Sequence, residues 1–524
     1  MLGAEAIAQG ALDAGMSGIY AYPGTPSTEI TEYVQRNRYA REQGIHSAWS
    51  ANEKTAMESA LGMSYAGKRA MVCMKHVGLN VAADAFVNSS ITGIGGGLIV
   101  AVADDPSMHS SQNEQDSRFY GSFAMIPVLE PSSQQEAYEM AYMGLQLSEE
   151  FHLPVMLRIT TRLSHSRSGI KRLEQLKENS LLLPDDPKQF VLLPSIARKR
   201  YKILLDLQPD LEKSSFNSPF NEYRPGTDTS KGIIACGIAL NYLEENFPDG
   251  ISHPVLKIGQ YPISRELMSK ITDSCESVLV LEEGYPLIEE GLRGLMNNSP
   301  IPVHGRLDGT LPRDGELNPD IVRKAMGLDS QSGPDIPGLV VMRPPALCKG
   351  CGHIDTFKAL LEALESYGGG RTFSDIGCYT LGALPPYNAV NSCVDMGASV
   401  TMAKGAADAG LVPAVAVIGD STFTHSGMTG LLDAVNENSS ITVVISDNET
   451  TGMTGGQESS ALGKLESICE GIGVDKEHIR TIVPLRKNHG ENVMVMKEEL
   501  EYDGVSVVVS RRECIQTAKK MKRK

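Results

Sequence analysis

The stretch GDSTFTHSGMTGLLDAVNENSSITVVISDN, from Gly419 to Asn448, decides the fold of the C-terminal half of the chain. One apolar run, AVAVIG, ends just before Asp420, and a second, ITVVIS, ends just before Asp447. Continuous apolar runs of this length predict strands that are buried on both faces, as in parallel sheets covered by helices. The intervening SGMTGLLDAVNEN is an amphipathic helix by its spacing. Because ligands of such sheets bind beyond the carboxyl ends of the strands, we expect Asp420 and Asn448 at one edge.

Asp420 and Asn448 carry the kinds of oxygen that a hard cation prefers. A carboxylate and an amide, with a backbone carbonyl nearby, suit an octahedral Mg²⁺ that also holds a diphosphate. The N-terminus of the helix between them could face the same anion. Acidic and amide residues also end strands simply as caps and turns. Spacing alone leaves a metal site and two unrelated turns as open alternatives.

The rest of the chain alternates helix and strand in the same way. Helical patterns such as EKTAMESALGMSYAG precede apolar runs such as RAMVCM, which predicts an α/β fold with doubly wound parallel sheets. Two charged segments with helical spacing, Lys171–Ser180 and Ala197–Leu207, interrupt the alternation. The predicted segments are residues 1–165, a linker region at 166–229, a second α/β unit at 230–330, a third at 340–513, and a basic tail at 514–524.

Composition narrows the class of protein. A chain of 524 residues is too long for one core and predicts several domains. Its net charge of −16 argues against a nucleic-acid-binding protein, which needs a basic face. No apolar run reaches the roughly 18 residues of a membrane helix. The N-terminus lacks a basic region followed by an apolar stretch. We therefore expect a cytoplasmic protein without membrane association.

Several long stretches resemble one family of enzymes. They are YPGTPSTEI, NEKTAMESALGMSYAGKRAMV, MKHVGLNVAAD, VADDPSMHSSQNEQDSR, RPPALCKGCGH, DIGCYTLGALPP and MGASVTMAKG. With GDSTFTHSGMTGL and DNETTGMTGGQ, they are similar to the 2-oxoacid:ferredoxin oxidoreductases, and within that family to the large subunits of the indolepyruvate type. The resemblance implies a thiamine-diphosphate-binding fold. In it, residues 1–165 hold the pyrimidine ring, residues 340–513 hold the diphosphate and metal, and residues 230–330 resemble the C-terminal domain of transketolase.

The same resemblance assigns roles to individual residues. It implies that Glu53 hydrogen-bonds the aminopyrimidine ring of thiamine, where it promotes loss of the C2 proton. It places Thr25, Lys75 and Arg118 against the substrate, and His76 and His425 along the catalytic site. The residues expected to contact the cofactor are Glu53, Gly352, His353, Gly377, Gly397, Gly419, Asp420, Ser421, Thr422, Asn448, Thr450 and Met453, of which Asp420, Asn448 and the Thr450 carbonyl hold Mg²⁺. Without the resemblance, Glu53 is one surface carboxylate among many, Arg118 a solvated loop charge, and each histidine an ordinary hydrogen-bonded residue.

The nine cysteines decide whether the reaction is a redox reaction. Cys348 and Cys351 form a C-x-x-C pair, which alone would indicate zinc or a thiol pair. In the pyruvate-oxidising relatives, such a pair joins a third and a fourth cysteine around a [4Fe–4S] cluster, and Cys378 and Cys514 have that layout here. The alternative is that Cys378 and Cys514 are small buried apolar residues. The remaining cysteines, Cys73, Cys236, Cys275, Cys393 and Cys469, are expected to be structural.

The implied activity is oxidative decarboxylation of a 2-oxoacid, most similar to the arylpyruvate type. Thiamine attacks the keto carbon, CO₂ leaves, the cluster takes the electrons singly, and coenzyme A takes the acyl group. The relatives continue into a ferredoxin-like domain that this sequence lacks, so we expect electrons to pass to a ferredoxin or a ferredoxin-type subunit. Expected partners also include a smaller β subunit and a second copy of the chain. Met453 follows the indolepyruvate pattern, whereas ESSALGK after TGGQ is more similar to the pyruvate enzymes. A non-oxidative thiamine-dependent decarboxylase and a non-catalytic subunit are the alternatives.

Overall fold

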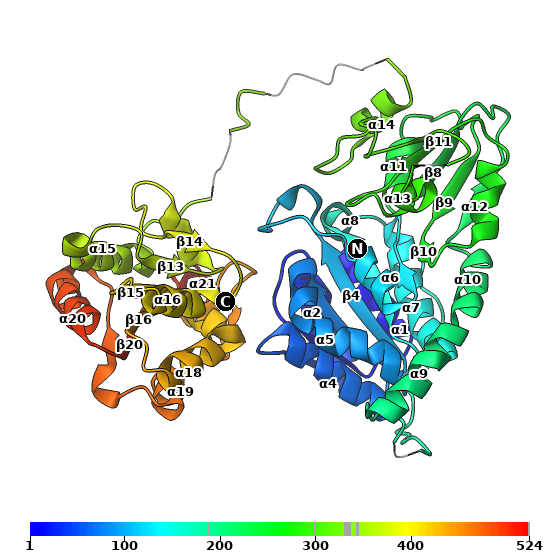
Figure 1. Ribbon diagram of the computed structural model, residues 1–524. Coiled ribbons are helices and arrows are strands. Elements are labelled where there is room, and N and C mark those ends of the chain that lie inside the picture. Colours follow the sequence, from blue (N-terminus) through cyan, green and yellow to red (C-terminus); the bar gives the residue numbers. More distant parts are fainter. Residues whose placement is uncertain (187, 298, 330–336, 342–344, 522–524) are drawn as a thin grey trace. The chain divides into compact units, whose positions relative to one another are not determined.

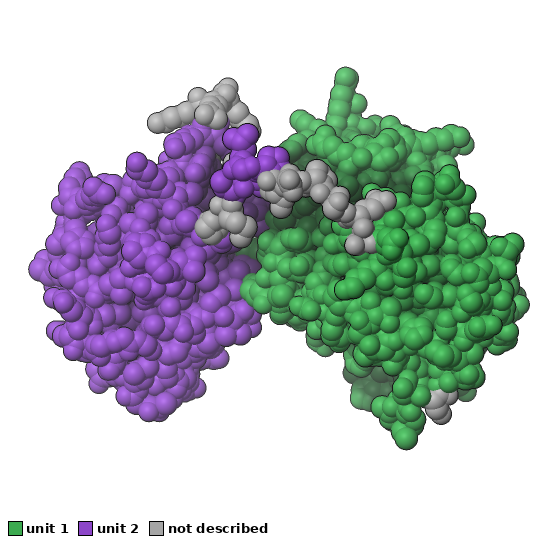
Figure 2. Space-filling model, turned by 90° about the horizontal axis from the view of Figure 1, so that it is seen from above, with its two compact units in different colours: residues 1–334 green, residues 335–524 purple. Residues whose placement is uncertain are grey.

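The computed structural model describes residues 1–186, 188–297, 299–329, 337–341 and 345–521. Parts of the predicted segments, including residues 330 and 342–344 and the last three of the basic tail, lie outside these ranges. The chain divides into two compact units, Met1–Pro334 and Asp335–Lys524, which Figure 2 colours separately. Each unit is described by itself below. No helix in the described ranges is both long and apolar enough to cross a membrane.

A seven-stranded sheet forms the core of the N-terminal half of unit 1 (Figure 1). Its strand order is β10-β5-β6-β4-β3-β1-β2, and every pair is parallel except the edge pair β10–β5. The strands are β1 (Gly18–Ala21), β2 (His46–Trp49), β3 (Ala70–Lys75), β4 (Leu98–Asp104), β5 (Val128–Leu129), β6 (Val155–Thr160) and β10 (Gln260–Tyr261). The helices are α1 (Gly3–Asp13), α2 (Thr28–Arg36), α3 (Arg38–Glu42), α4 (Glu53–Tyr65), α5 (His76–Thr92), α6 (Arg118–Ala124), α7 (Gln134–Phe151) and α8 (Thr161–His165).

Helices cover both faces of this sheet, as the apolar strands require. Met71 and Cys73 of β3 belong to the apolar cluster that includes α1, α2 and α7, whereas Val72 and Met74 pack with α4 and α5. All six residues of β3 are buried. A strand buried on both faces favours apolar side chains along its length, and the polar residues of β3 come at its end, where Lys75 is followed directly by His76 at the start of α5.

A second, five-stranded sheet follows in the same unit, with the order β12-β11-β8-β9-β7. Its strands are β7 (Glu222–Arg224), β8 (Gly232–Cys236), β9 (Val255–Ile258), β11 (Val278–Leu281) and β12 (Val303–His304). Its helices are α11 (Ala239–Glu244), α12 (Arg265–Thr272), α13 (Leu287–Arg293) and α14 (Pro319–Ala325), and α9 (Pro194–Asp206) and α10 (Gln208–Phe216) precede it. The chain returns from β9 to add β10 to the edge of the first sheet. We call these five strands the middle sheet.

The segment Lys171–Ser180 is not the helix that its spacing predicts. It has no regular secondary structure, and its groups bind side chains that belong to the first sheet and its helices. Arg172 bonds the buried Asp13 at 2.6 Å through Nη2, and the Leu173 amide donates to the Tyr138 hydroxyl. These tertiary contacts outweigh the helical propensity of the segment, because intrinsic propensity amounts to only a few tenths of a kcal/mol per residue. The second charged segment does form a helix, since α9 covers most of it.

Unit 2 contains one six-stranded, fully parallel sheet in the order β14-β13-β15-β16-β20-β19. The strands are β13 (Thr372–Ser374), β14 (Ser392–Cys393), β15 (Ala414–Gly419), β16 (Ile441–Asp447), β19 (Ile479–Ile482) and β20 (Val505–Arg511). The helices are α15 (Gly352–Leu364), α16 (Ala398–Asp408), α17 (Asp420–Thr422), α18 (Met428–Asn436), α19 (Leu465–Ile472), α20 (His489–Glu501) and α21 (Ile515–Met521). A small hairpin of β17 (Thr450–Thr451) and β18 (Gln457–Glu458) follows β16. The predicted α/β fold is confirmed.

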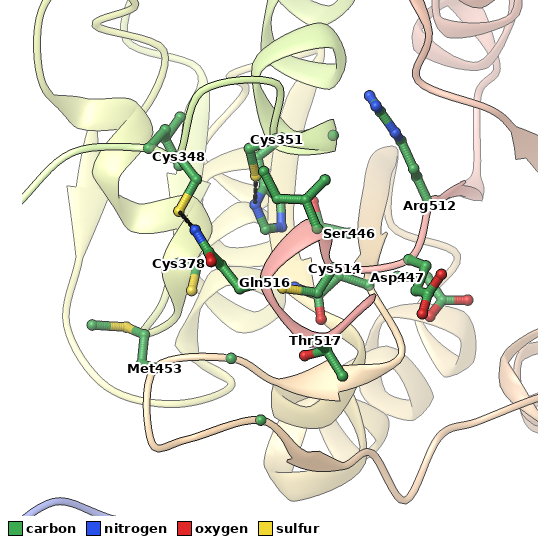
Figure 3. A pocket seen from close by; sticks show the side chains of 18 of the residues that line it. Cys348, Cys351, Cys378, Ser446, Asp447, Met453, Arg512, Cys514, Gln516 and Thr517 are labelled. Carbon is green, nitrogen blue, oxygen red and sulfur yellow. Dashed lines mark hydrogen bonds between the residues drawn. The ribbon is translucent and has the colours of Figure 1, made fainter. Parts of the chain in front are cut away.

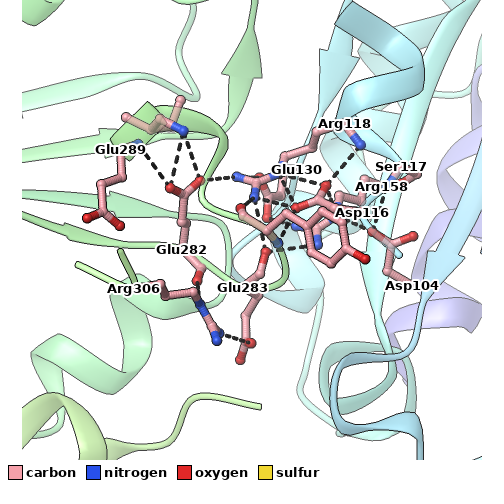
Figure 4. A network of polar contacts seen from close by, with 12 residues as sticks. Asp104, Asp116, Ser117, Arg118, Glu130, Arg158, Glu282, Glu283, Glu289 and Arg306 are labelled. Carbon is pink, nitrogen blue, oxygen red and sulfur yellow. Dashed lines mark hydrogen bonds and ion pairs between the residues drawn. The ribbon is translucent and has the colours of Figure 1, made fainter. Parts of the chain in front are cut away.

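Buried ion pairs connect the first sheet of unit 1 to the middle sheet (Figure 4). Three arginines that are at most 2 % exposed, Arg118, Arg158 and Arg306, meet the buried carboxylates of Asp104, Asp116, Glu130, Glu282 and Glu283. Carboxylates outnumber arginines in this cluster. Burial raises the pKa of Glu282 to about 7 and that of Glu283 to about 8, although nearby arginines oppose the shift. The folded chain therefore holds protons here that solvent-exposed carboxylates would release.

This predicts that the two carboxyl groups lower the stability of the chain as the pH rises from about 5 to about 8. The folded state keeps the Glu282 and Glu283 protons up to about pH 7 and 8, whereas the unfolded chain releases them near pH 4.5. Unfolding then releases protons, so each carboxyl lowers the free energy of unfolding by up to about 1.4 kcal/mol per pH unit until its folded pKa is passed. Urea unfolding across this range measures the effect. Glu282→Gln and Glu283→Gln should each flatten the slope, and Glu245→Gln, at an exposed position, should not. Equal slopes in all four proteins would contradict the prediction.

Candidate active site

Predicted site residues of unit 1 gather at the carboxyl edge of the first sheet. Glu53 begins α4 just after β2, is 5 % exposed, and faces the first turn of α5. A Cβ at Gly78 would lie 2.5 Å from Glu53 Oε1, so only glycine at this position leaves room for the carboxylate. Glu53 and His76 are therefore brought together beside the N-terminus of α5.

The loop of residues 105–117, which we call the β4 loop, brings Thr25, Lys75 and His76 together. Lys75 Nζ donates to the Ser110 carbonyl at 2.7 Å and lies 3.9 Å from Asp105 Oδ2. The Ser110 hydroxyl donates to the Thr25 carbonyl at 3.3 Å. His76 Nε2 lies 3.2 Å from the Asn113 carbonyl. Burial lowers the pKa of Lys75 to about 8, so near neutral pH part of the lysine population is an uncharged amine.

Arg118 lies in the buried ion-pair cluster rather than in the β4 loop. Its Nη2 atom is 2.5 Å from Asp116 Oδ2, and the same nitrogen donates to the Tyr285 carbonyl at 2.8 Å. Its Nη1 atom is 2.9 Å from Glu282 Oε2. The side chain is 1 % exposed. The structure thus does not bring Arg118 together with Lys75 and His76, and its contact with a substrate carboxylate stays a prediction.

In unit 2, Asp420 and Asn448 lie at the ends of adjacent strands, as predicted. β15 and β16 are paired in parallel with Gly419 opposite Ser446, so the residues after each strand share one edge. Asp420 is 2 % exposed, and burial raises its pKa to about 7. Within the described part of the chain, its Oδ2 atom has no hydrogen-bond partner. A buried, unpartnered carboxylate oxygen is costly unless a cation or another donor meets it.

The turn after β16 holds the two other residues predicted to bind Mg²⁺. Asn448 Oδ1 accepts a bond from the Thr450 amide at 3.1 Å, and the Thr450 hydroxyl donates to the Gln457 carbonyl at 2.9 Å. The turn is thus fixed by its own bonds. The donor set, a carboxylate oxygen without a partner, an amide and a backbone carbonyl, has the chemistry that Mg²⁺ selects. We conclude that the chemical nature of these residues suits Mg²⁺.

The helix after β15 begins irregularly. Asp420–Thr422 form a helical turn, Phe423–Gly427 form a π-helical turn, and the regular helix α18 follows. Turns of this kind are frequent at functional sites. His425 lies in the π turn at 3 % exposure, with Nδ1 2.6 Å from the Ser426 hydroxyl. Ser421 and Thr422 are also largely buried, and their hydroxyls bond Thr451 and the Ile376 carbonyl.

Three of the four predicted cofactor glycines, Gly377, Gly397 and Gly419, are positions of close approach. A Cβ at Gly377 would lie 2.2 Å from the Tyr379 ring and one at Gly419 would lie 2.6 Å from it. Gly397 has a φ of +97°, and a Cβ there would meet Ser426. The structure accounts for these glycines by internal packing around Tyr379 and Ser426. Their contact with a cofactor stays a prediction.

All four cysteines predicted to hold a cluster line one cavity of about 230 Å³ (Figure 3). Cys348 and Cys351 precede α15, Cys378 follows β13, and Cys514 precedes α21. The Cys514 amide donates to the Asn448 carbonyl at 3.1 Å, which connects the cavity directly to the turn after β16. The side chains of His353 and Met453, both predicted to contact the cofactor, belong to the same lining. Gly352 lies there too.

The thiol groups fit an iron–sulfur cluster in number and chemistry. Four thiolates are what a [4Fe–4S] cluster requires. Within residues 1–186, 188–297, 299–329, 337–341 and 345–521, however, no group of three or more histidine, cysteine or carboxylate side chains is gathered around a single metal position. Burial raises the pKa of Cys351, and raises that of Cys378 to about 12. The other five cysteines do not line this cavity.

Sequence reasoning missed several residues of the two edges. Asp375 follows β13, is fully buried, and has a pKa raised by burial to about 7. Its carboxylate accepts from the Tyr379 hydroxyl and from Ser399 Oγ, the latter at 2.6 Å. The sequence offered little signal for Asp375, because the strand before it, TFS, is short and is not an apolar run like the AVAVIG before Asp420. The closeness of Gly78 to Glu53 left no signal, because it depends on how two helices cross.

Comparisons with known proteins agree with this geometry. Residues 9–201 match the family described as pyruvate flavodoxin/ferredoxin oxidoreductase, thiamine diphosphate-binding. Residues 375–507 match the C-terminal thiamine pyrophosphate-binding domain of thiamine pyrophosphate enzymes. The two edges described above fall in these two matches. A fold of this kind with these two edges defines a thiamine-diphosphate-dependent enzyme, and the prediction of that cofactor is confirmed.

Two similar proteins specify the family. Indolepyruvate oxidoreductase subunit IorA of Methanothermobacter thermautotrophicus is 38 % identical over 98 % of this chain and 86 % of the relative. IorA of Archaeoglobus fulgidus is 39 % identical with the same coverage. The chain belongs to the IorA family of indolepyruvate oxidoreductase subunits, and so to the 2-oxoacid oxidoreductases. In fold it is similar to 2-oxoglutarate:ferredoxin oxidoreductase from Magnetococcus marinus, with a TM-score of 0.50 at 15 % identity over 62 % of this chain and 64 % of that one.

Gly78→Ala should separate cofactor binding from cofactor activation. The new methyl group would displace the Glu53 carboxylate, the movable end of a side chain, so the fold should survive. A displacement of about 1 Å at a reacting group lowers its rate about 100-fold. The measurement is C2-proton exchange of bound thiamine diphosphate. Gly62→Ala, on the helix that Glu53 begins and in open space, is the matched control and should exchange like wild type. Equal exchange rates in both variants would contradict the placement of Glu53.

Proposed function

We propose that this chain is the catalytic large subunit of an oxidoreductase that decarboxylates an arylpyruvate-type 2-oxoacid and transfers the acyl group to coenzyme A. Electrons leave through a [4Fe–4S] cluster to a ferredoxin or a ferredoxin-type subunit. The observation that carries the proposal is the pair of edges within the two thiamine-diphosphate matches, one with Glu53 and the other with the unpartnered Asp420 oxygen. The names of the relatives supply the substrate class. A smaller β subunit, a dimer of this chain and a cytoplasmic location complete the proposal.

When bound, thiamine diphosphate supplies a carbon nucleophile for the keto carbon and an acceptor for the electrons freed as CO₂ departs. Glu53 would hold a proton at the aminopyrimidine ring. Asp420, Asn448 and the Thr450 carbonyl would hold Mg²⁺ against the diphosphate. Lys75, fixed by Ser110, would lie toward the substrate carboxylate, and its low pKa would let it move a proton near neutral pH.

The cysteine cavity supports the redox part of the proposal. Cys348, Cys351, Cys378 and Cys514 share one lining with Asn448, the residue predicted to hold the metal at the diphosphate. A cluster held there would lie next to the cofactor half that unit 2 provides. The alternative of a non-oxidative decarboxylase lacks a use for these four thiols.

The test is anaerobic turnover of the complete complex with indolepyruvate, phenylpyruvate, a branched 2-oxoacid, pyruvate and 2-oxoglutarate, with coenzyme A and a ferredoxin. We expect the highest kcat/KM for the arylpyruvates and a loss of about 100-fold or more in Glu53→Gln, as for removal of a general acid–base group. Preference for pyruvate or 2-oxoglutarate would contradict the substrate class. Unchanged turnover in Glu53→Gln would mean that this chain is a non-catalytic subunit.

Iron analysis of the same preparation tests the cluster. We expect four irons per chain in wild type, a loss of iron and of charge-transfer absorbance in Cys348→Ser, and wild-type values in Cys393→Ser, whose cysteine lies in the same unit but outside the cavity. An iron-free wild-type protein that decarboxylates 2-oxoacids would establish the non-oxidative alternative.

A further inference from the structure

Two parts of the chain far apart in sequence hold opposite sides of the β4 loop. On one side the loop binds Lys75 and His76, through Ser110 and the Asn113 carbonyl. On the other it binds the turn Glu282–Pro286 at the end of β11, which we call the clasp turn. The clasp turn follows strand β11 of the middle sheet. The proposed reaction gives the middle sheet no role in catalysis.

Tyr285 of the clasp turn bonds the β4 loop twice. Its hydroxyl donates to the Glu114 carbonyl at 3.0 Å, and its backbone amide donates to Asp116 Oδ2 at 3.0 Å. Its ring lies beside Phe119, with ring centroids 6.0 Å apart, and under the Arg313 guanidinium at 5.4 Å. The Tyr285 hydroxyl thus bonds the loop one residue after Asn113, which contacts His76.

Two of the three buried arginines, Arg118 and Arg158, bond the backbone of the clasp turn. Arg118 donates through Nη2 to the Glu283 carbonyl at 3.1 Å and to the Tyr285 carbonyl at 2.8 Å. Arg158 donates through Nη2 to the same Glu283 carbonyl at 3.0 Å. Both arginines also pair with Asp116 at the end of the β4 loop. The guanidinium groups therefore connect the loop to the turn through charged hydrogen bonds (Figure 4).

Gly284 allows this close approach. Its φ is +85°, and a Cβ there would lie 2.7 Å from Asp116 Oδ2 and 3.0 Å from Arg158 Nη2. Only a residue without a side chain can bring the backbone of the turn against the Asp116 carboxylate in this conformation. The conformation of the clasp turn at Gly284 therefore allows its backbone to contact Asp116 of the β4 loop.

A second contact outside the cluster joins the same two parts. Glu316, which follows the middle sheet, accepts from Arg162 at 2.6 Å and lies 3.4 Å from His109 of the β4 loop. The loop is therefore held at His109, Glu114 and Asp116 by residues of the middle sheet and its loops. A buried set of charges is an expensive way to join two sheets, since well-packed apolar residues would serve as well. The buried charges are explained if their role is to fix the position of the β4 loop.

We propose that the middle sheet positions the β4 loop, and through it Lys75 and His76, by the bonds that Tyr285 of the clasp turn makes to the Glu114 carbonyl and to Asp116 of the loop. Tyr285 and Asp116 are positioning residues, because they act on Lys75 and His76 through the β4 loop and not by direct contact. This inference rests on the proposed function for the consequence in turnover, but the positioning of the loop stands independently of it.

The test uses the full chain carrying Tyr285→Phe, which removes the hydroxyl and keeps the ring. Hydrogen exchange of the protein without substrate should rise about three- to tenfold in residues 105–117, the effect of losing one hydrogen bond, with the rest of unit 1 unchanged. Tyr201→Phe, a partly exposed tyrosine on α9, is the matched control and should exchange like wild type. Gly284→Ala should raise the exchange of the same loop further, because its methyl group would displace Asp116.

Wild-type exchange of the β4 loop in both variants would overturn the proposal, as would a rise spread evenly over unit 1. In the assembled complex, the KM of Tyr285→Phe for the preferred 2-oxoacid should rise by a similar factor while kcat changes less. A loosened loop with an unchanged KM would overturn the link to Lys75 and His76. If neither wild type nor any variant turns over a 2-oxoacid, the proposed function is wrong. The hydrogen-exchange result still tests whether the clasp turn positions the β4 loop.

Discussion

Burial of the parallel strands on both faces is the constraint on which the rest of this structure depends. In both units the central strands have apolar side chains on each side, packed against separate helical layers. Most polar groups then lie where the strands end, and one that lies inside a strand, such as Arg158 in β6, needs buried charged partners. The residues with chemistry follow from this, since Lys75 ends β3, Asp104 ends β4, and Asp420 follows β15. Each is largely buried and so is sensitive to what lies next to it.

The buried carboxylates of the two units are satisfied in different ways. In unit 1 the arginines meet them, and proton uptake at Glu282 and Glu283 balances the excess of negative charge. In unit 2 Asp420 has one oxygen without a partner in the described residues. In unit 1 the charges are compensated within the cluster, which joins two sheets. The arrangement in unit 2 leaves an oxygen available to the Mg²⁺ that we propose at this edge, in a segment that matches thiamine pyrophosphate-binding domains.

The sequence was sufficient for the parts of the fold that depend on local pattern. The α/β alternation, the strands on either side of Gly419–Asn448 and the shared edge of Asp420 and Asn448 all follow from apolar runs and their spacing. Two features did not follow. Lys171–Ser180 is not helical because Asp13 and Tyr138 bind it, and Arg118 is buried because Asp116, Glu282 and the Tyr285 carbonyl surround it. Both depend on contacts between residues distant in sequence, which no local pattern encodes.

The central claim is that Asp420 anchors thiamine diphosphate through a metal ion at the edge of unit 2. Calorimetric titration of the full chain with thiamine diphosphate, with and without Mg²⁺, tests it most directly. Asp420→Asn should bind no better with Mg²⁺ than without it, because a neutral amide attracts the cation far less than a carboxylate. Asp433→Asn, on the exposed face of α18, should keep the full Mg²⁺ dependence of wild type. Wild-type affinity and Mg²⁺ dependence in Asp420→Asn would contradict the account.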